Sequence, residues 1–156
     1  MFLAIIAIVF LLDQGSKLAV QTAMYHGESI AVFPPVFYFT YVLNPGAAFG
    51  LLAHRSMLFI SVTLLLVAGV LLAYKRLAAG RVLVKTGLGL VIGGALGNLV
   101  DRLRFGMVVD FLDFRVWPVF NLADSAIVAG AFLLAWEILK NADDKGQKRE
   151  SKFDRS

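Results

Sequence analysis

The chain has 156 residues, of which 59% are hydrophobic and 17% charged, and its mean hydropathy is +0.77. Soluble domains are about 45–50% apolar and about 25% charged, so this composition excludes an ordinary soluble protein and indicates a membrane protein. The absence of cysteine excludes disulfides, thiolate catalysis and thiolate metal sites. The net charge of +4 does not predict a nucleic-acid partner, because the basic residues lie in short loops and in the C-terminal segment.

Four segments are long and apolar enough to cross a bilayer, which takes about 20 helical residues. They cover residues 2–23, 57–74, 86–104 and 122–139. The first is expected to be retained rather than cleaved, because no basic residue precedes its apolar part and no small-residue cleavage site follows it. Residues 1–140 are therefore expected to form one membrane domain, and the polar residues 141–156 a disordered cytoplasmic tail.

The orientation of these spans follows from the basic residues, which are concentrated on the cytoplasmic side of membrane proteins. One side carries Lys75, Arg76, Arg81, Lys85, Lys140, Lys145, Lys148, Arg149, Lys152 and Arg155, and the other carries Arg55, Arg102, Arg104 and Arg115. This asymmetry predicts that both termini lie in the cytoplasm and that residues 25–55 and 105–121 lie on the outer side.

The first outer segment contains residues 36–42, an aromatic and β-branched run that predicts a strand, closed by a turn at Asn44-Pro45-Gly46. A lone strand has no backbone partners in hydrocarbon, so it is expected in a small sheet at the interface. In the third span, Gly89, Gly93 and Gly97 recur every four residues, which favours close helix packing over a role in chemistry. The predicted fold is a membrane all-α protein, a four-transmembrane-helix bundle with a small interfacial β-sheet and outer-face loops.

Acidic residues within spans mark the candidate site, because a charge in a membrane is costly. Asp101 follows Lys85, and Asp124 precedes Lys140, by sixteen residues each. At 1.5 Å per residue both lie roughly 24 Å from the cytoplasmic boundary of a core about 30 Å thick. Asp110 lies in the short outer connection between the two helices and is able to fold back to that level. The sequence therefore predicts a cluster of carboxylates just beneath the outer surface.

Other catalytic chemistries have little support. His26 and His54 lie outside the spans without ligand spacing to one another, so a metal site or a Ser/His triad is not expected. Ser16 and Lys17 are adjacent and point about 100° apart, whereas Asp13 lies one helical turn from Lys17, so an Asp13–Lys17 pair is favoured over a Ser/Lys dyad.

Two carboxylates that share one proton are sufficient for peptide hydrolysis. Like charges at close range cannot both ionise cheaply, so one pKa rises and the other falls. The ionised carboxylate takes a proton from the attacking water, and the protonated one donates to the carbonyl oxygen and then to the leaving amine. This chemistry needs no metal or cofactor.

Five motifs resemble those of lipoprotein signal peptidase, also called signal peptidase II, and they occur in the family's order. They are residues 12–17 (LDQGSK), 44–49 (NPGAAF), 93–102 (GGALGNLVDR), 108–111 (VVDF) and 120–126 (FNLADSA). The resemblance implies that Asp110 and Asp124 are the catalytic pair. It also implies a diacylglyceryl-modified prolipoprotein substrate, cut before its lipidated cysteine at the outer face of the bacterial cytoplasmic membrane. The connector 111–123 looks shorter than in many relatives.

Other residues of these motifs are candidates for substrate binding or support. Asn98, Asp101 and Arg102 share one helix face and suit the orientation of a carboxylate, with helix capping and an Asp101–Arg102 surface pair as the alternative. Asn121 either caps the fourth helix or supports the site. Asn44 with Gly46 is a turn residue or, by resemblance, lies at the substrate groove.

Asp13 and Lys17 complete the set of supporting residues, whereas Asp113 and Arg115 are expected to be exposed loop charges. Two other functions stay open from the sequence. A small proton-coupled transporter also needs acids in a bundle, although spread along a path, and a non-catalytic adaptor needs none. A monomer surrounded by membrane lipid is expected.

Overall fold

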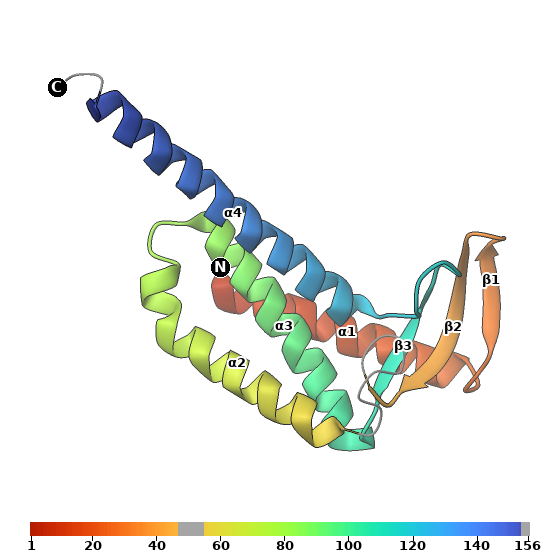
Figure 1. The fold of residues 1–156 in the computed structure, drawn as a ribbon. Coiled ribbons are helices and arrows are strands. Elements are labelled where there is room, and N and C mark those ends of the chain that lie inside the picture. The colour runs from red at the N-terminus through yellow and green to blue at the C-terminus, as the bar shows by residue number, and fades with distance from the viewer. Residues whose placement is uncertain (47–54, 154–156) are drawn as a thin grey trace.

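The computed structural model describes the backbone of residues 1–46 and 55–153, and the side chains of the same ranges up to Asn141. It contains α1 (Phe2–Ala23), α2 (Ser56–Leu77), α3 (Val82–Phe105) and α4 (Leu122–Phe153), arranged side by side (Figure 1). All four are long and apolar enough to span a membrane, which confirms the predicted spans. α4 continues to Phe153 through the segment expected to be disordered, while the division at residue 140 stays a prediction.

α3 is the central helix of the bundle. Within an apolar stretch of 18 residues in each helix, 61% of the residues are buried in α3, against 11% in α1, 6% in α2 and 11% in α4. Small residues allow this central position, because a Cβ on Gly93 would lie 2.8 Å from Cβ of Val9 in α1. On the α4 side, a Cβ on Gly87 would lie 2.9 Å from the carbonyl oxygen of Gly130. The predicted packing role of the glycine stripe is confirmed.

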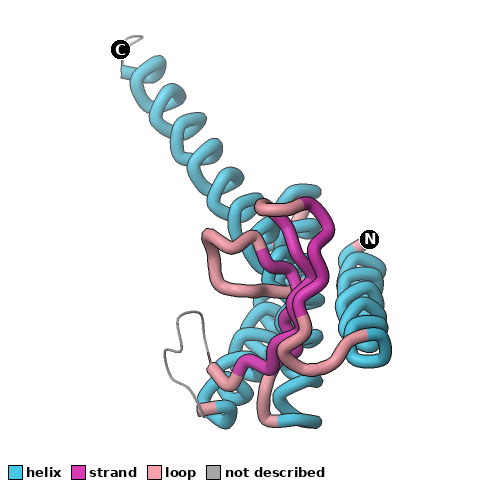
Figure 2. Tube along the Cα trace, turned by 90° about the vertical axis from the view of Figure 1, so that its right-hand side faces the viewer, coloured by secondary structure: helices cyan, strands magenta, loops and turns pink. Residues whose placement is uncertain are grey.

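A three-stranded antiparallel sheet lies at one end of the bundle (Figures 1 and 2). Its order is β1 (Ser29–Phe33), β2 (Phe37–Asn44) and β3 (Val108–Asp113). β2 confirms the predicted strand, displaced by one or two residues. The outer strand β1 is exposed along its whole length, whereas β3 is almost entirely buried against α1 and α3. The sheet thus covers the end of the bundle with its inner strand.

The connection from α3 to β3 places Asp110 over the end of the bundle. α3 ends at Gly106, whose φ of 70° lies in the left-handed region that glycine adopts without strain. The chain then reverses into β3, where Asp110 pairs with Val42 and Val108 with Asn44. Asp110 and Asn44 therefore come from neighbouring strands at one end of the sheet.

The expectation that Asp113 is an exposed loop charge is wrong. Asp113 is the last residue of β3 and only 5% exposed. Its Oδ2 accepts a hydrogen bond of 2.7 Å from Thr40 Oγ1, and Arg115 Nε lies 3.5 Å from the same oxygen. The sequence did not show that the strand extends this far. Arg115 is exposed, as expected, and its guanidinium lies 3.8 Å from the ring centroid of Tyr38.

Candidate active site

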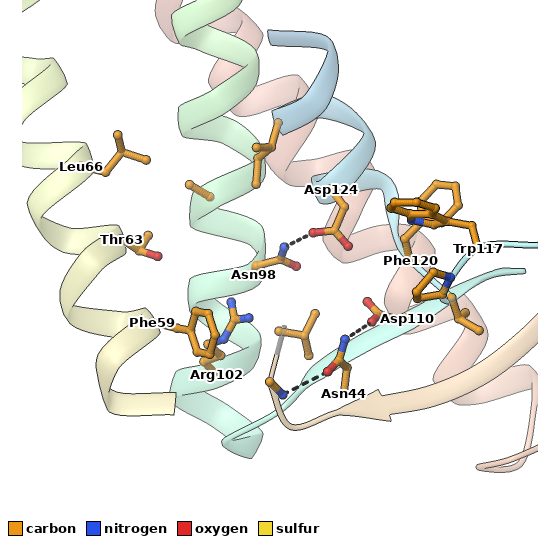
Figure 3. Close-up of a pocket in the computed structure, with 16 residues that line it drawn as sticks. Asn44, Phe59, Thr63, Leu66, Asn98, Arg102, Asp110, Trp117, Phe120 and Asp124 are labelled. Atoms are coloured by element: carbon orange, nitrogen blue, oxygen red, sulfur yellow. Dashed lines mark hydrogen bonds between the residues drawn. The ribbon is translucent and has the colours of Figure 1, made fainter. Parts of the chain in front are cut away.

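A cavity of about 360 Å³ lies between the helices and the inner strand of the sheet. Asp110 from β3 and Asp124 from the first turn of α4 both line it. Asn44, Asn98 and Arg102 line it as well, from β2 and α3 (Figure 3). Segments far apart in the sequence thus bring the predicted catalytic pair and four of the predicted supporting residues, Gly46 included, to one cavity.

Asp110 is buried, with 2% of its surface exposed. Asn44 Nδ2 donates to its Oδ2 at 2.9 Å, and Asn121 Nδ2 donates to its Oδ1 at 2.6 Å. Burial, and after it the negative charge of Asp124, raise the pKa of Asp110 to about 7, although the Asn44 and Asn121 hydrogen bonds and the charge of Lys17 act in the opposite direction. This carboxyl group is therefore suited to hold a proton near neutral pH.

Asp124 lies at the amino end of α4, where the helix dipole favours an anion. Its Oδ1 accepts a hydrogen bond of 2.8 Å from Asn98 Nδ2, and its Oδ2 accepts one of 3.3 Å from the backbone N–H of Asn121. In return, the Asp124 N–H donates to Asn121 Oδ1 at 2.9 Å. Asn121 thus caps α4, which confirms one of its two interpretations, while its role in supporting the site stays a prediction.

A second cluster of charges lies beside the cavity and is centred on Lys17. Its Nζ lies 2.8 Å from Asp13 Oδ2, 2.8 Å from Asp101 Oδ2 and 2.9 Å from Asn98 Oδ1. The predicted Asp13–Lys17 pair is confirmed. Asp101 pairs with Lys17, so the Asp101–Arg102 surface pair is not the arrangement found. All three donor directions of the ammonium group are occupied.

The Lys17 cluster connects four elements to one another. Asp13 Oδ1 accepts the Ala123 N–H at 3.0 Å, which holds the amino end of α4 against α1. Asp101 Oδ2 accepts the Val109 N–H at 3.1 Å, which holds β3 against α3. A Cβ at Gly97 would collide with the Asp13 carboxylate, so this glycine makes room for a charge as well as for a helix. The sequence pattern indicated only the second role.

Asn98 joins the cluster to the cavity. Its Oδ1 accepts hydrogen bonds from Lys17 Nζ at 2.9 Å and from Asn121 Nδ2 at 3.1 Å, while its Nδ2 donates to Asp124. With its oxygen held by two donors, the amide group presents its nitrogen to Asp124. The prediction that Asn98 orients a carboxylate agrees with this geometry.

Asn44, Gly46 and Arg102 are the other predicted supporting residues that line the cavity. Asn44 Oδ1 accepts the Gly46 N–H at 3.0 Å, which forms a turn, while its amide nitrogen binds Asp110. Arg102 lines the cavity with its guanidinium 4.6 Å from the Phe59 ring centroid. Ala47, Ala48 and Phe49 of the second motif, and His54, lie outside the described residues.

Sequence reasoning assigned no role in the site to several residues. Gln14 Nε2 donates to Asp101 Oδ1 at 3.0 Å and to the Gly97 carbonyl oxygen at 3.2 Å. Its place in the first motif was the available signal. Phe59, Trp117 and Phe120 line the cavity. The place of Phe120 in the fifth motif was the available signal for it, whereas nothing in the spacing of Phe59 and Trp117 indicates their position. Within the described ranges, no three histidine or acidic residues are placed to hold a metal ion.

The spans and the cavity define a multi-pass membrane protein with a carboxylate site at one end of its bundle. Two solved bacterial membrane enzymes have the same fold. One superposes with a TM-score of 0.88 at 31% identity, covering 92% of this chain and 90% of the other. The second gives a TM-score of 0.82 at 31% identity, covering 89% and 92%.

The family model for signal peptidase (SPase) II matches residues 5–140. The chain therefore belongs to the signal peptidase II family and is a membrane peptidase. The lipoprotein signal peptidase of Pelotomaculum thermopropionicum is 63% identical over 148 residues, 95% of this chain and 97% of that protein. The lipoprotein signal peptidase of Moorella thermoacetica is 50% identical over 147 residues, 94% and 98% of the two chains.

Proposed function

We propose that the protein is an aspartic endopeptidase that removes the signal peptide of diacylglyceryl-modified prolipoproteins, cutting before the lipidated cysteine. The observation that carries this proposal is the pair of carboxylates, Asp110 and Asp124, that face one cavity from β3 and α4. Their described hydrogen bonds come from neutral amides, so neither negative charge is cancelled by a directly bound cation. Such a pair favours the form that holds one proton.

In this mechanism Asp124 is the base and Asp110 the acid. Asp124 is held as an anion by the helix dipole and by the N–H groups of Asn98 and Asn121. It takes a proton from the water that attacks the peptide carbonyl carbon. Asp110 holds the proton near neutral pH and donates it to the carbonyl oxygen. When the carbon–nitrogen bond breaks, the proton on Asp124 passes to the leaving amine, and Asp110 takes back a proton from a hydroxyl group of the intermediate as the new carboxylic acid forms.

Supporting residues position this pair and the peptide. Asn98 and Asn121 hold the two carboxylates, and Asn44 with Gly46 forms the rim of the cavity on the sheet side. The guanidinium of Arg102 adds positive charge to the cavity wall. That charge favours the negative charge that develops on the carbonyl oxygen.

For the orientation in the membrane, we infer that both termini are cytoplasmic and that the site lies near the outer face. The distribution of basic residues supports this assignment. Since the chain has no cysteine, a Ser156→Cys variant carries a single thiol. We expect an impermeant thiol reagent to label it only after the cells are opened. Labelling in intact cells would show that the C-terminus lies outside and would contradict this orientation.

The family match favours a peptidase over the transporter and the adaptor. The direct test is release of a signal peptide by the purified protein in detergent. We expect cleavage of a diacylglyceryl-modified precursor and negligible cleavage of the same precursor without the lipid, because two acyl chains hold a substrate firmly at the bilayer. Equal rates for the two precursors would contradict the proposal.

The same assay tests the expectation that no metal or cofactor takes part. A chelator should leave turnover unchanged, because the proposed acid and base are side chains of the protein. Loss of activity on chelation, restored by adding a metal ion, would exclude the two-carboxylate mechanism.

A further inference from the structure

A second hollow begins where the carboxylate cavity ends. It is a groove of about 800 Å³, and it shares Trp117, Phe120 and Asp124 with the cavity. Apart from Asp124 and Ser125, every side chain that lines it is apolar or aromatic. A charged cavity and an apolar groove thus meet at the side chain of one proposed catalytic residue.

The groove follows one face of α4. Beyond Asp124 its lining includes Val128, Ala129 and Phe132, which recur at the spacing of a single helix face. From Asp124 to Phe132 the helix rises by roughly 12 Å at 1.5 Å per residue. This is close to the depth of one leaflet, about half of a hydrocarbon core some 30 Å thick. The groove therefore runs from the level of the site toward the middle of the membrane.

The surface of the groove is open to the surrounding lipid. Val128 is 69% exposed and Phe132 is 67% exposed, so a chain is able to enter from the side. Where the groove meets the cavity, Trp117 and Phe120 form a wall common to both. These two residues belong to the connection between β3 and α4. A molecule with a polar peptide part and an apolar chain has a separate surface for each part.

We propose that this groove is the binding site for an acyl chain of the substrate, and that Val128, Ala129 and Phe132 determine acyl-chain preference. The proposal rests on the proposed function, since that function supplies a substrate with acyl chains. With the chain in the groove, the lipidated cysteine lies beside Asp124, and the peptide bond before it lies in the carboxylate cavity. The groove thereby sets the position of the cut relative to the lipid.

The test fills the groove at its middle and compares the result with the same change on another helix. Ala129→Phe places a ring in the groove, whereas Ala7→Phe adds the same ring at an exposed alanine of α1 that lines neither hollow. Both variants are assayed with one precursor carrying either dipalmitoylglyceryl or dibutanoylglyceryl. Thermal melting in detergent confirms that each variant is folded.

We expect Ala129→Phe to raise KM for the dipalmitoyl precursor about tenfold, equivalent to losing roughly two methylene contacts. Its kcat, and its KM for the dibutanoyl precursor, should stay close to wild type. Ala7→Phe should leave every constant close to wild type. If the wild type cleaves the precursors and the two variants give the same constants, the groove holds only ordinary membrane lipid and the proposal is wrong. If the wild type cleaves neither precursor, the proposed function itself fails.

A second measurement does not depend on a substitution in the groove. A dipalmitoyl precursor with a photoreactive diazirine in the middle of one acyl chain is irradiated with the Asp110→Asn protein, which is expected to bind without cutting. Adducts should fall on Val128, Ala129 or Phe132. Adducts confined to α1 or to other faces of α4 would overturn the proposal.

Discussion

Four aspartates lie near one another at the sheet end of the bundle, and they form two different kinds of site. Asp13 and Asp101 both contact Lys17 at 2.8 Å, so the cluster pairs each acid directly with a buried cation. Asp110 and Asp124 accept hydrogen bonds from amide groups and face a cavity. A single side chain, Asn98, separates the two regions, with its oxygen on Lys17 and its nitrogen on Asp124.

The difference shows how neighbours decide what a carboxylate does. In the Lys17 cluster the ammonium group attracts both acids. Asp13 Oδ1 also accepts the Ala123 N–H, and Asp101 Oδ2 also accepts the Val109 N–H, and these bonds hold α4 and β3 in place. In the cavity, two anions without a direct cation repel one another, so one of them holds a proton more readily. The cluster is suited to hold the fold together and the cavity to move a proton.

The largest expected effect is on catalysis and follows from removing either cavity acid. Asp110→Asn and Asp124→Asn should each lower kcat by at least about a thousandfold, roughly 4 kcal/mol of transition-state stabilisation. Because the two carboxylates act as one unit, the double variant should be little worse than either single variant. Single-turnover cleavage of a modified precursor measures all three. Additive losses would mean that the acids act independently.

The largest expected effect on stability comes from removing the cation of the Lys17 cluster. Lys17→Met leaves the buried carboxylates of Asp13 and Asp101 without a cation, which should cost roughly 3–5 kcal/mol. Thermal melting in detergent measures this loss, and Lys75→Met, at an exposed position of α2, is the matched control. A melting temperature close to wild type would show that the buried pairs do not hold the fold.

The pH dependence of activity and of stability should both reflect Asp110 in the cavity. Activity requires protonated Asp110, whose pKa is raised to about 7 by burial and by Asp124, so kcat/KM should fall as pH rises above about 7. The pKa of Asp110 in the folded protein exceeds the unfolded value of about 3.8, so between these two values the folded protein binds more protons than the unfolded chain. Stability should therefore also fall as pH rises through about 7. Asp110→Asn should flatten the dependence of the melting temperature on pH, and an unchanged slope would assign it to another group.

The smallest expected effect lies at the far end of β3. The sequence predicts an exposed loop charge at Asp113, but this side chain is buried and accepts a hydrogen bond from the Thr40 hydroxyl. Asp113→Asn should lower stability by about 1 kcal/mol and leave kcat within about twofold. Thr40→Val removes the same hydrogen bond, so the two changes combined should cost less than their sum. Strict additivity would contradict the contact.

The spans and the level of the acids could be predicted from the sequence, because hydrophobic length and helical rise need no knowledge of packing. The Asp13–Lys17 pair could be predicted for the same reason, since both residues lie on one helix. The contact between Lys17 and Asp101 could not, because it depends on how α1 packs on α3 at Gly97. Local patterns likewise did not reveal β1, the burial of Asp113, or the place of Phe59 and Trp117 beside the carboxylates.

The most direct test of the difference between the two regions compares Asp110→Asn with Asp101→Asn in one experiment. Each purified variant is given a diacylglyceryl-modified precursor, and its melting temperature is measured in the same detergent. We predict that Asp110→Asn stays folded and loses nearly all turnover. Asp101→Asn should melt at a lower temperature and lose activity only in proportion to that loss of stability. A fully folded but inactive Asp101→Asn, beside an Asp110→Asn that retains more than about a tenth of wild-type kcat, would instead make Asp101 the second catalytic acid.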